Sequence, residues 1–502
     1  MAIEKLKPFI NGKFVESSSG KYMEIYDPSV GEVIAETPCC TAAEVESAIA
    51  AARTAFPEWS NTPCPKRVEV LYKFRDLLVQ NMDELTYMLC RENGKNWEES
   101  KGDILKVKEP VEVACGVPSL IMGESLMNIT KGFDSTLYRE PIGVFAGIAP
   151  FNFPAMIPMG WMMPMCIATG NTLVLKAASM TPMTSLRLAA LLREAGLPDG
   201  VVNILTCSRN EAELFLTHPD VKGITFVGST SVGRHVYATA AANGKRVQCL
   251  CEAKNHALVL ADAPIARTAA GIINSAFGCA GERCMALPAV AVEESVADQL
   301  VEELVKQVKT KKVGPAYDKT TDLGPVVTGD HKKFVLGWIE KGIQEGARLI
   351  LDGRDISVPG YEKGFYIGHT IFDHVTPEMT VGQSEIFGPV LCIKRVKNFE
   401  DGITLMNNNP FANGSVIFTQ NGYYAREFAK RTHGGMVGVN VGIPVPAGMF
   451  PFAGHKLSFF GDLHCLGKDG LRFYTESKVV TTHWFTEEET RKTKVSTWDG
   501  AL

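Results

Sequence analysis

Apolar and polar positions alternate along this chain with two different periods. Short apolar runs, of the kind that form buried strands, occupy residues 143–149, 172–176, 201–206, 223–227 and 256–260, with helical stretches between them. The same alternation resumes with an apolar run at 288–292 and a helical stretch at 297–308. Because parallel strands need crossover helices between them, this order predicts an α/β fold built from two successive α/β lobes.

The first long helix is predicted near the N-terminus. Thr41 and Glu44 have the spacing of a capping box, and apolar residues between 45 and 56 recur on one helix face. Pro57 is expected to end this helix because proline cannot donate the next backbone hydrogen bond.

Length and composition indicate a large globular protein. With 502 residues, the chain is too long for one ordinary core, so two or three domains are expected. The net charge of −5 predicts no basic surface for nucleic acid, and the lysines at 309–312 are read as a solvated face. The most hydrophobic stretch, 155–169, contains two prolines and is shorter than the roughly twenty residues that span a bilayer, so no membrane contact is expected.

The cysteines and histidines predict neither disulfides nor a metal site. Thirteen cysteines is an odd number, and the N-terminus opens with no apolar signal segment, so we expect reduced thiols in the cytoplasm. Cys249 and Cys251 do not form a CxxC pair, and His256 and His464 are isolated from other residues that bind metals.

Cys284 is the strongest candidate for chemistry. It lies in the segment 277–286, where glycines would allow a substrate and backbone N–H groups to approach the sulfur. A thiolate attacks carbonyl carbons well, and the adjacent Arg283 would favour the thiolate form. Taken alone, a cysteine such as Cys279 or Cys284 is more often an ordinary small core residue, and only the other segments favour a nucleophile.

Three other segments add polar groups at the ends of predicted strands. Asn152, between two prolines after the strand at 143–149, is held in a rigid turn, where its amide is either a fixed donor or a local cap. Lys176 ends the strand at 172–176. The small-residue turn 228–233 follows the strand at 223–227 and precedes a helix, an arrangement that presents N–H groups to a phosphate. Glu385 and Phe387 form a further acidic and aromatic pair.

Taken in order, these segments resemble the aldehyde dehydrogenase superfamily over nearly the whole chain. The sequences at 151–159, 253–256, 281–286, 460–464 and 467–470 are similar to its methylmalonate-semialdehyde dehydrogenase branch, which is CoA-acylating. The resemblance implies the aldehyde dehydrogenase fold. It comprises a Rossmann-like dinucleotide-binding domain (1–121 and 139–252), an α/β catalytic domain (253–447) and a small β arm for oligomerisation (122–138 and 471–487), including a strand at 471–482. It also implies a homodimer or homotetramer.

The resemblance implies a role for each candidate residue. Cys284 would carry a thioester, and Asn152 with the Cys284 backbone N–H would stabilise the oxyanion. Arg283 and Lys106 would bind the anionic group of the substrate. Lys176 would contact the adenine-side ribose, Ser229 the pyrophosphate, Glu385 the nicotinamide ribose and Phe387 the nicotinamide. The full set of expected cofactor contacts is Ala149, Phe151, Lys176, Ser179, Gly228, Ser229, Gly233, Glu385 and Phe387.

Two departures from the superfamily bear on nucleotide choice and acyl release. Most members have, at the position of Ser179, a glutamate that accepts hydrogen bonds from the ribose hydroxyls and repels a 2′-phosphate. Serine removes both effects, so NADP is a second candidate besides NAD. Leu250 stands 34 residues before Cys284, where hydrolytic members have the glutamate that activates water. Its absence favours coenzyme A as the acyl acceptor, with Glu252 as an alternative base for hydrolysis.

The substrate anion stays open between several groups. Lys106 aligns with an arginine of the branch; lysine keeps the charge but lacks the bidentate fork, so the anion could be a carboxylate, a sulfonate or a phosphonate. Lys106 could also be a solvated helix residue. The leading expectation is oxidation of malonate semialdehyde or methylmalonate semialdehyde to acetyl-CoA or propanoyl-CoA with loss of CO2. The alternatives are a hydrolytic dehydrogenase, an acylating enzyme for a sulfonated aldehyde, and a non-catalytic relative.

Overall fold

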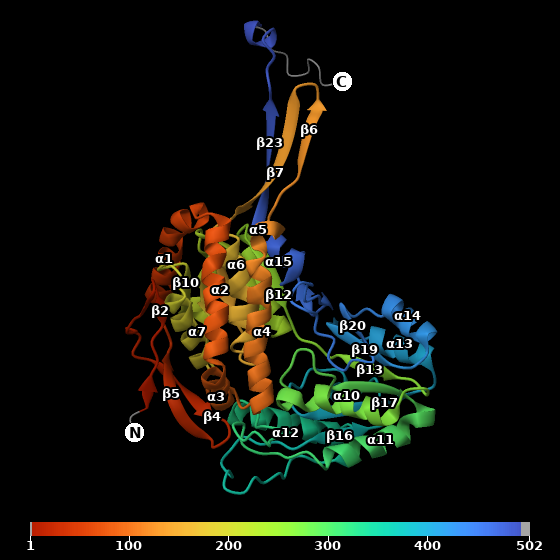
Figure 1. The fold of residues 1–502 in the computed structure, drawn as a ribbon. Helices are drawn as coiled ribbons and strands as arrows, with labels where there is room; N and C mark the ends of the chain where they lie inside the picture. Colours follow the sequence, from red (N-terminus) through yellow and green to blue (C-terminus); the bar gives the residue numbers. More distant parts are fainter. Residues whose placement is uncertain (1–2, 493–502) are drawn as a thin grey trace.

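An eight-stranded sheet forms the centre of the first lobe in the computed structural model, which describes residues 3–492 (Figure 1). Its order is β22–β12–β11–β8–β9–β10–β2–β3, with parallel pairing from β12 to β10 and antiparallel strands at the edges. The strands are β2 (Phe9–Ile10), β3 (Lys13–Phe14), β8 (Val144–Ile148), β9 (Thr172–Lys176), β10 (Val202–Leu205), β11 (Val221–Val227), β12 (Arg246–Leu250) and β22 (Phe459–Phe460). The predicted strands of this lobe are confirmed, and they read as continuous apolar runs because helices cover both faces of the sheet.

The helices of the first lobe include a bundle on one face of the sheet. They are α1 (Ala42–Asn61), α2 (Cys64–Gln80), α3 (Met82–Asn93), α4 (Trp97–Cys115), α5 (Val117–Leu120), the π-helix η1 (Met156–Met162), α6 (Met163–Ala168), α7 (Met183–Glu194), α8 (Arg209–Thr217), α9 (Thr230–Ala242) and α15 (Gly467–Phe473). A separate three-stranded sheet lies beside them, made of β1 (Glu4–Lys5), β4 (Tyr22–Asp27) and β5 (Glu32–Pro38).

Helix α1 begins as predicted but does not end at Pro57. Thr41 is the N-cap, and its side chain and that of Glu44 form the reciprocal capping box. The helix continues through Pro57 to Asn61, so the predicted end was wrong. Trp59 explains the continuation, because it is buried and its indole Nε1 donates to the carbonyl of Ile167 at 3.0 Å, which offsets the one hydrogen bond that proline removes.

The second lobe contains a seven-stranded sheet in the order β15–β16–β17–β14–β13–β19–β20, in which only the edge strand β15 is antiparallel. Its strands are β13 (His256–Val259), β14 (Ala289–Glu293), β15 (Arg348–Leu351), β16 (Thr370–Asp373), β17 (Val390–Val396), β19 (Gly414–Phe418) and β20 (Met436–Val439). The helices around it are α10 (Ile265–Phe277), α11 (Glu294–Val308), α12 (Gly329–Gln344), α13 (Phe399–Asn407) and α14 (Gly422–Arg431), with short 3-10 turns η2 (Gly278–Gly281) and η3 (Thr380–Gly382). The predicted second lobe is confirmed.

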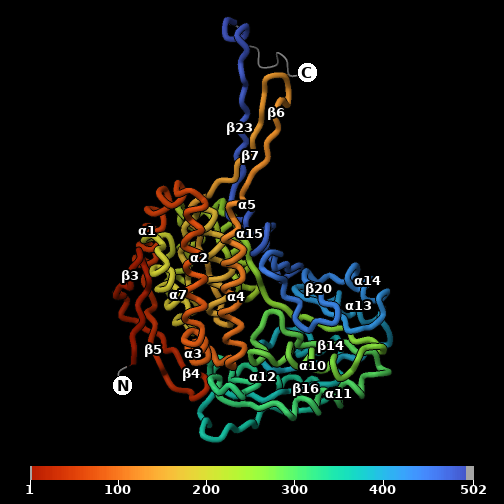
Figure 2. The backbone as a smooth tube through the Cα atoms, in the orientation of Figure 1, coloured from red at the N-terminus to blue at the C-terminus, as the bar shows by residue number. Residues whose placement is uncertain are grey.

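A three-stranded arm projects from the first lobe (Figures 1 and 2). It is formed by β6 (Ser125–Thr130), β7 (Phe133–Pro141) and β23 (Thr475–His483), so two segments far apart in the sequence pair along the central strand β7. The strand expected from residue 471 begins only at Thr475, because the preceding residues belong to α15. Residues 448–470, which the sequence assigned to no domain, include β21 (His455–Lys456), which pairs with β18 (Phe411–Ala412), and β22 at the edge of the first sheet.

Residues 3–492 contain no helix that is both long and apolar enough to cross a membrane. The chain ends of the described region lie at opposite ends of the molecule, with the C-terminal segment leaving from the tip of the arm (Figure 2). The segment after β8 carries Asn152, and the segment after α10 carries Cys284. The candidate site therefore lies where the two lobes meet.

Candidate active site

The loop that carries Cys284 is tightly folded. Cys279, Ala280 and Gly281 all have positive φ angles, of 51°, 52° and 75°. A Cβ atom at Gly281 would lie 2.1 Å from the carbonyl oxygen of Gly388, so only glycine allows the loop to pack against the segment that follows Glu385. The carbonyl of Cys284 accepts hydrogen bonds from the side-chain amide of Asn255 at 2.8 Å, which fixes the position of the nucleophile's backbone.

Burial keeps the thiol of Cys284 protonated. The pKa of this thiol is raised to about 12, chiefly by desolvation and then by the nearby charge of Glu385, while Arg283 acts to lower it. The side chain is nonetheless partly exposed to solvent, unlike that of Cys279. The sequence prediction that Arg283 favours the thiolate has the right sign, but the effect of burial is larger.

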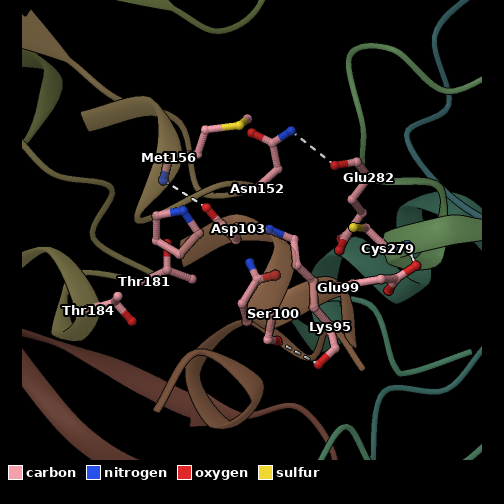
Figure 3. Close-up of polar contacts among 12 residues, drawn as sticks. Lys95, Glu99, Ser100, Asp103, Asn152, Met156, Thr181, Thr184, Cys279 and Glu282 are labelled. Carbon is pink, nitrogen blue, oxygen red and sulfur yellow. Dashed lines mark hydrogen bonds and ion pairs between the residues drawn. The ribbon is translucent and has the colours of Figure 1, made fainter. Parts of the chain in front are cut away.

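Asn152 lies directly against the Cys284 loop. It is buried, and its Nδ2 atom donates to the carbonyl oxygen of Glu282 at 3.0 Å (Figure 3). An amide nitrogen carries two hydrogens, so this bond orients the amide and leaves one donor for a substrate oxygen. The structure thus brings together Asn152 and Cys284, which the sequence paired across 132 residues.

A cavity of about 500 Å³ opens at Cys284. Its walls combine apolar side chains with a few charged ones. The lining residues are Glu98, Glu99, Gly102, Asp103, Lys106, Phe153, Met156, Trp161, Arg283, Cys284, Met285, Ile443, Val445 and Phe452. Both cations predicted to bind the substrate anion, Arg283 and Lys106, therefore face the same space as the nucleophile.

Each of these cations already has partners in the protein. Lys106 Nζ lies 2.5 Å from Glu109 Oε2 and is partly exposed. Arg283 donates through Nε to the Cys279 sulfur at 3.1 Å, and its Nη2 lies 3.3 Å from Glu99 Oε1. An anionic substrate would therefore share Arg283 with Glu99 instead of meeting a free guanidinium.

The predicted cofactor residues gather at the carboxyl ends of β8, β9 and β11. The backbone N–H of Ala149 donates to the carbonyl of Lys176 at 3.0 Å, so the ends of two neighbouring strands are joined there. Lys176 ends β9, burial lowers the pKa of its ammonium group, and Ser179 follows in the loop before α7. A crevice at the carboxyl ends of parallel strands is where such folds bind nucleotides.

The turn before α9 has the form of a phosphate site. Ser229 is the N-cap of α9, and its side chain makes no capping bond; its Oγ atom lies 3.4 Å from Ser231 Oγ. A Cβ atom at Gly228 would lie 2.6 Å from the Phe226 ring, and one at Gly233 would lie 2.3 Å from the Cys251 sulfur. These two positions therefore need glycine for close packing of the helix against the sheet.

Glu385 and Phe387 lie between the turn and the nucleophile loop. Glu385 Oε1 accepts from the backbone N–H of Ala253 at 3.1 Å, and burial raises the pKa of its carboxyl to about 8. Phe387 has a φ of 58°, which is strained for a bulky residue. His331 donates to the Phe387 carbonyl at 2.7 Å, and the rings of Phe151 and Phe387 meet edge to face at 5.8 Å.

The alternative base, Glu252, is engaged elsewhere. Its Oε2 atom accepts a hydrogen bond from the backbone N–H of Thr230 at 2.8 Å, in the first turn of α9. Glu252 is not among the described residues that line the Cys284 cavity. Leu250, at the end of β12, is buried. The negative charge of Glu252 therefore lies at the predicted pyrophosphate turn and not beside the thiol.

Residues 3–492 hold no group of three or more side chains that could bind a metal ion. His256 is buried, with Nδ1 at 2.7 Å from the Lys254 carbonyl and Nε2 at 3.0 Å from Lys394 Nζ. The His464 ring stacks on Phe459. Both histidines thus have structural contacts within the protein.

Several residues at the site were not singled out from the sequence. Asn255 and Asn413 hold the Cys284 carbonyl, and Glu99 holds Arg283. Asn255 was within a quoted motif, which could have drawn attention to it. Glu99 and Asn413 had no local signal, because their partners lie 184 and 129 residues away in the sequence.

Comparison with known proteins places this site in a family. Residues 14–480 match the model of the aldehyde dehydrogenase family. Malonate-semialdehyde dehydrogenase 1 of Oceanobacillus iheyensis is 47% identical over 480 residues, covering 96% of this chain and 98% of that protein. Malonate-semialdehyde dehydrogenase 1 of Geobacillus thermodenitrificans is 48% identical over 483 residues, covering 96% and 99%.

Solved structures confirm the predicted fold. The methylmalonate-semialdehyde dehydrogenase of Oceanimonas doudoroffii superposes with a TM-score of 0.95 at 42% identity, covering 98% of this chain and 100% of that one. A candidate methylmalonate-semialdehyde dehydrogenase of Sinorhizobium meliloti, solved with NAD, gives 0.95 at 42% identity, covering 97% and 99%. Since the match spans nearly the whole chain, this protein belongs to the aldehyde dehydrogenase family and is a nicotinamide-dependent aldehyde oxidoreductase.

Proposed function

We propose that this protein oxidises a small anionic semialdehyde, malonate semialdehyde or methylmalonate semialdehyde, and transfers the acyl group to coenzyme A. The products are acetyl-CoA or propanoyl-CoA, CO2 and reduced NAD or NADP. One observation carries the proposal: Arg283 and Lys106 line the same cavity as Cys284, so a thiol nucleophile and two cations border one small space. The names of the relatives, malonate-semialdehyde dehydrogenase, favour the same substrate class.

The residues of the cavity suit the first step of this reaction. The Cys284 thiol first gives its proton to solvent, to which the side chain is partly exposed, and the thiolate then adds to the aldehyde carbon, whose carbonyl oxygen becomes an oxyanion. Asn152 Nδ2 and the Cys284 backbone N–H stabilise that charge, and loss of one such donor typically costs about a hundredfold or more in rate. A nicotinamide bound in the crevice beside Glu385 and Phe387 would supply the acceptor for the hydride that leaves this carbon. A thioester on Cys284 then remains in the cavity.

Release of the acyl group requires a second nucleophile. Loss of the carboxylate as CO2 from the malonyl-type thioester leaves a thioester enolate, which takes up a proton from solvent at its α-carbon and becomes a simple acyl group. The coenzyme A thiol then attacks the thioester carbonyl, and the Cys284 sulfur leaves and regains a proton. Leu250 cannot deprotonate water, and the Glu252 carboxylate is hydrogen-bonded at the α9 turn. Both features favour thiol transfer over hydrolysis.

The cofactor crevice suits a dinucleotide. We assign the pyrophosphate to the turn Gly228–Gly233 with Ser229, the adenine-side ribose to Lys176, and the nicotinamide side to Glu385 and Phe387. Ala149 and Phe151 border the same strand ends. Ser179 provides no carboxylate against a 2′-phosphate, so NADP is a second candidate. NAD is the first candidate because a structurally similar relative was solved with NAD.

The test is nucleotide reduction by the purified protein with malonate semialdehyde and methylmalonate semialdehyde, with NAD or NADP, with and without coenzyme A, and with product masses recorded. Formation of acetyl-CoA or propanoyl-CoA that depends on coenzyme A supports the proposal. Turnover to a free acid without coenzyme A contradicts it and supports hydrolysis. Cys284→Ala should abolish oxidation while nucleotide binding persists, and Cys64→Ala is the control because that partly exposed cysteine does not line the cavity.

The arm suits assembly into a homodimer or homotetramer. Large apolar side chains are exposed along it and at its tip: Leu126, Met127, Ile129, Val479, Val480, Trp484 and Phe485. Exposed apolar patches of this kind mark interfaces. Light scattering after gel filtration should give a mass of two or four chains, and a monomer would contradict this assignment. We propose a cytoplasmic location because thirteen cysteines, an odd number, are typical of a chain with reduced thiols.

A further inference from the structure

The N-terminal half of α4 touches both halves of the proposed reaction centre. Glu99 and Asp103 lie four residues apart and therefore on one face of the helix. Both line the cavity at Cys284. Glu99 contacts the loop of the nucleophile, and Asp103 contacts the turn of Asn152, as Figure 3 shows.

Asp103 anchors the turn that carries Asn152. Its Oδ1 accepts from the backbone N–H of Met156 at 2.7 Å, and its Oδ2 pairs with Lys95 Nζ at 2.8 Å. The Lys95 ammonium lies 3.7 Å from the centre of the Phe153 ring. The side chains of Lys95 and Asp103 are 1% and 0% exposed. This buried pair therefore contacts the turn at two points, one and four residues beyond Asn152.

The start of the same turn is held from other elements. The carbonyl of Phe151 accepts from Asn93 Nδ2 at 2.9 Å and from Thr181 Oγ1 at 3.1 Å. The backbone is thus held by hydrogen bonds on both sides of Asn152, and Asp103 accepts the one on the C-terminal side. The amide has little freedom to move independently of α4.

Glu99 anchors the loop that carries Cys284. Its Oε1 accepts from the backbone N–H of Cys279 at 2.7 Å and from Arg283 Nη2 at 3.3 Å. Cys279 has a positive φ, and a hydrogen bond to its N–H helps to hold that uncommon conformation. Because Arg283 directly precedes the nucleophile, Glu99 contacts the loop at residues five and one before Cys284.

The helix itself is fixed at this end. Asn96 is the N-cap of α4, and its side chain accepts from the backbone N–H of Glu99 at 3.0 Å. Its Nδ2 atom donates to the carbonyl of Asp322 in the second lobe at 2.8 Å. Asn96 therefore fixes the start of α4 against the second lobe through a contact that is independent of the Glu99 and Asp103 side chains.

We propose that Glu99 and Asp103 are positioning residues which together set the separation and orientation of the Asn152 amide relative to Cys284. One rigid helix face holds the donor of one lobe and the nucleophile of the other. The oxyanion of the bound aldehyde then meets a preplaced donor. This inference rests on the roles proposed above for Asn152 and Cys284, and neither carboxylate needs to contact the reacting atoms.

The test compares variants that keep or remove a single hydrogen-bond acceptor. Asp103→Asn and Asp103→Leu are made in a Lys95→Met background, so no buried cation is left unpaired. Asparagine retains an acceptor for the Met156 N–H, whereas leucine of similar size does not. The leucine variant should lose about 10- to 100-fold in kcat relative to the asparagine variant, the scale of a displacement of about 1 Å. Its NAD affinity should match that of the asparagine variant, whereas its Tm should be lower because the buried Met156 N–H loses its acceptor.

Glu99→Gln and Glu99→Ala form the second matched pair. Glutamine keeps an acceptor for the Cys279 N–H, and alanine removes it. Alanine should reduce kcat about tenfold relative to glutamine, with NAD affinity unchanged. Equal kcat values for the two variants would contradict the role of Glu99 in holding the loop.

A double-mutant cycle with Asn152→Ala separates positioning from general damage. If Asp103 acts through the Asn152 amide, the difference between the leucine and asparagine variants should shrink to less than about threefold once that amide is gone. A difference that persists in full would overturn the inference while leaving the role of Asn152 intact. If Asn152→Ala alone retains full activity, the proposed oxyanion role fails, and the positioning role fails with it.

Discussion

The reactivity of Cys284 towards an alkylating agent should depend on pH in a way set by two buried acids. Burial raises the pKa of the Cys284 thiol to about 12, so near pH 8 only about one molecule in ten thousand carries the thiolate. Iodoacetamide reacts with the thiolate. The rate of alkylation in the enzyme without cofactor should therefore rise about tenfold per pH unit, with no plateau at neutral pH.

Ionisation of Glu385 should lower the slope of the alkylation rate against pH above pH 8. The pKa of its carboxyl is raised to about 8 by burial, and its negative charge raises the pKa of Cys284. Below pH 8, Glu385 is mostly protonated and has little effect on the thiol. Above pH 8, it ionises and holds the thiol protonated more strongly, so the slope should fall below tenfold per unit.

Glu385→Gln should restore a constant slope of tenfold per pH unit, whereas Arg283→Met should lower the alkylation rate. The glutamine variant should follow the wild type below pH 8 and react about tenfold faster well above it. The methionine variant should react more slowly throughout, because Arg283 lowers the pKa of the thiol. The assay is mass spectrometry of the Cys284 peptide, with the peptides of Cys39 and Cys64 as internal references, since these are the other two cysteines that are not fully buried.

A wild-type plateau below pH 8 would refute this reasoning, because it would mean that the loop stabilises the thiolate more than burial opposes it. The same conclusion would follow if Glu385→Gln kept the lower slope above pH 8, since some other group would then be titrating near pH 8 beside the thiol.

Three further outcomes are expected. Ser179→Glu should raise the KM for NADP about tenfold or more and leave the KM for NAD within about threefold, measured by steady-state kinetics; equal changes for both would contradict a contact with the ribose. Glu252→Gln should tighten NAD binding a few-fold in calorimetry, because it removes a negative charge from the predicted pyrophosphate turn, and it should not change the dependence on coenzyme A. Lys106→Met should raise the KM for an anionic semialdehyde about tenfold but not that for propanal; a similar rise for both would show that Lys106 does not contact the anion.

The sequence predicted the lobes well because each strand is covered on both faces. Such strands read as apolar runs, as in β9, and the intervening helices give the parallel order. The errors occurred where packing between distant segments overrides a local signal. Pro57 should have ended α1, but the burial of Trp59 against residue 167 keeps the helix intact. The final strand begins at Thr475 because residues 467–473 instead form α15.

The candidate site was predicted to the extent that its residues lie in recognisable segments. Cys284, Asn152 and Arg283 each had a local pattern, and the structure brings them together. No local pattern predicted which groups pair with each charged side chain. Arg283 reads as a free cation in the sequence, whereas its guanidinium already contacts the Cys279 sulfur and Glu99. Such pairs depend on how α4 packs against the second lobe.

The balance of charges around Arg283 bears on which substrates the cavity accepts. An arginine held by a carboxylate attracts an anion less than a free one does, because the substrate must compete with Glu99 for the same guanidinium. The same contact holds the nucleophile loop, through the Cys279 N–H. A substrate anion that drew Arg283 away from Glu99 would therefore also loosen that loop. An anion that shares the guanidinium with Glu99 keeps the loop in place, and Lys106, which is itself paired with Glu109, offers its charge only by the same kind of sharing. Because both cations are already paired within the protein, the cavity should favour an anion that contacts both of them without displacing either carboxylate.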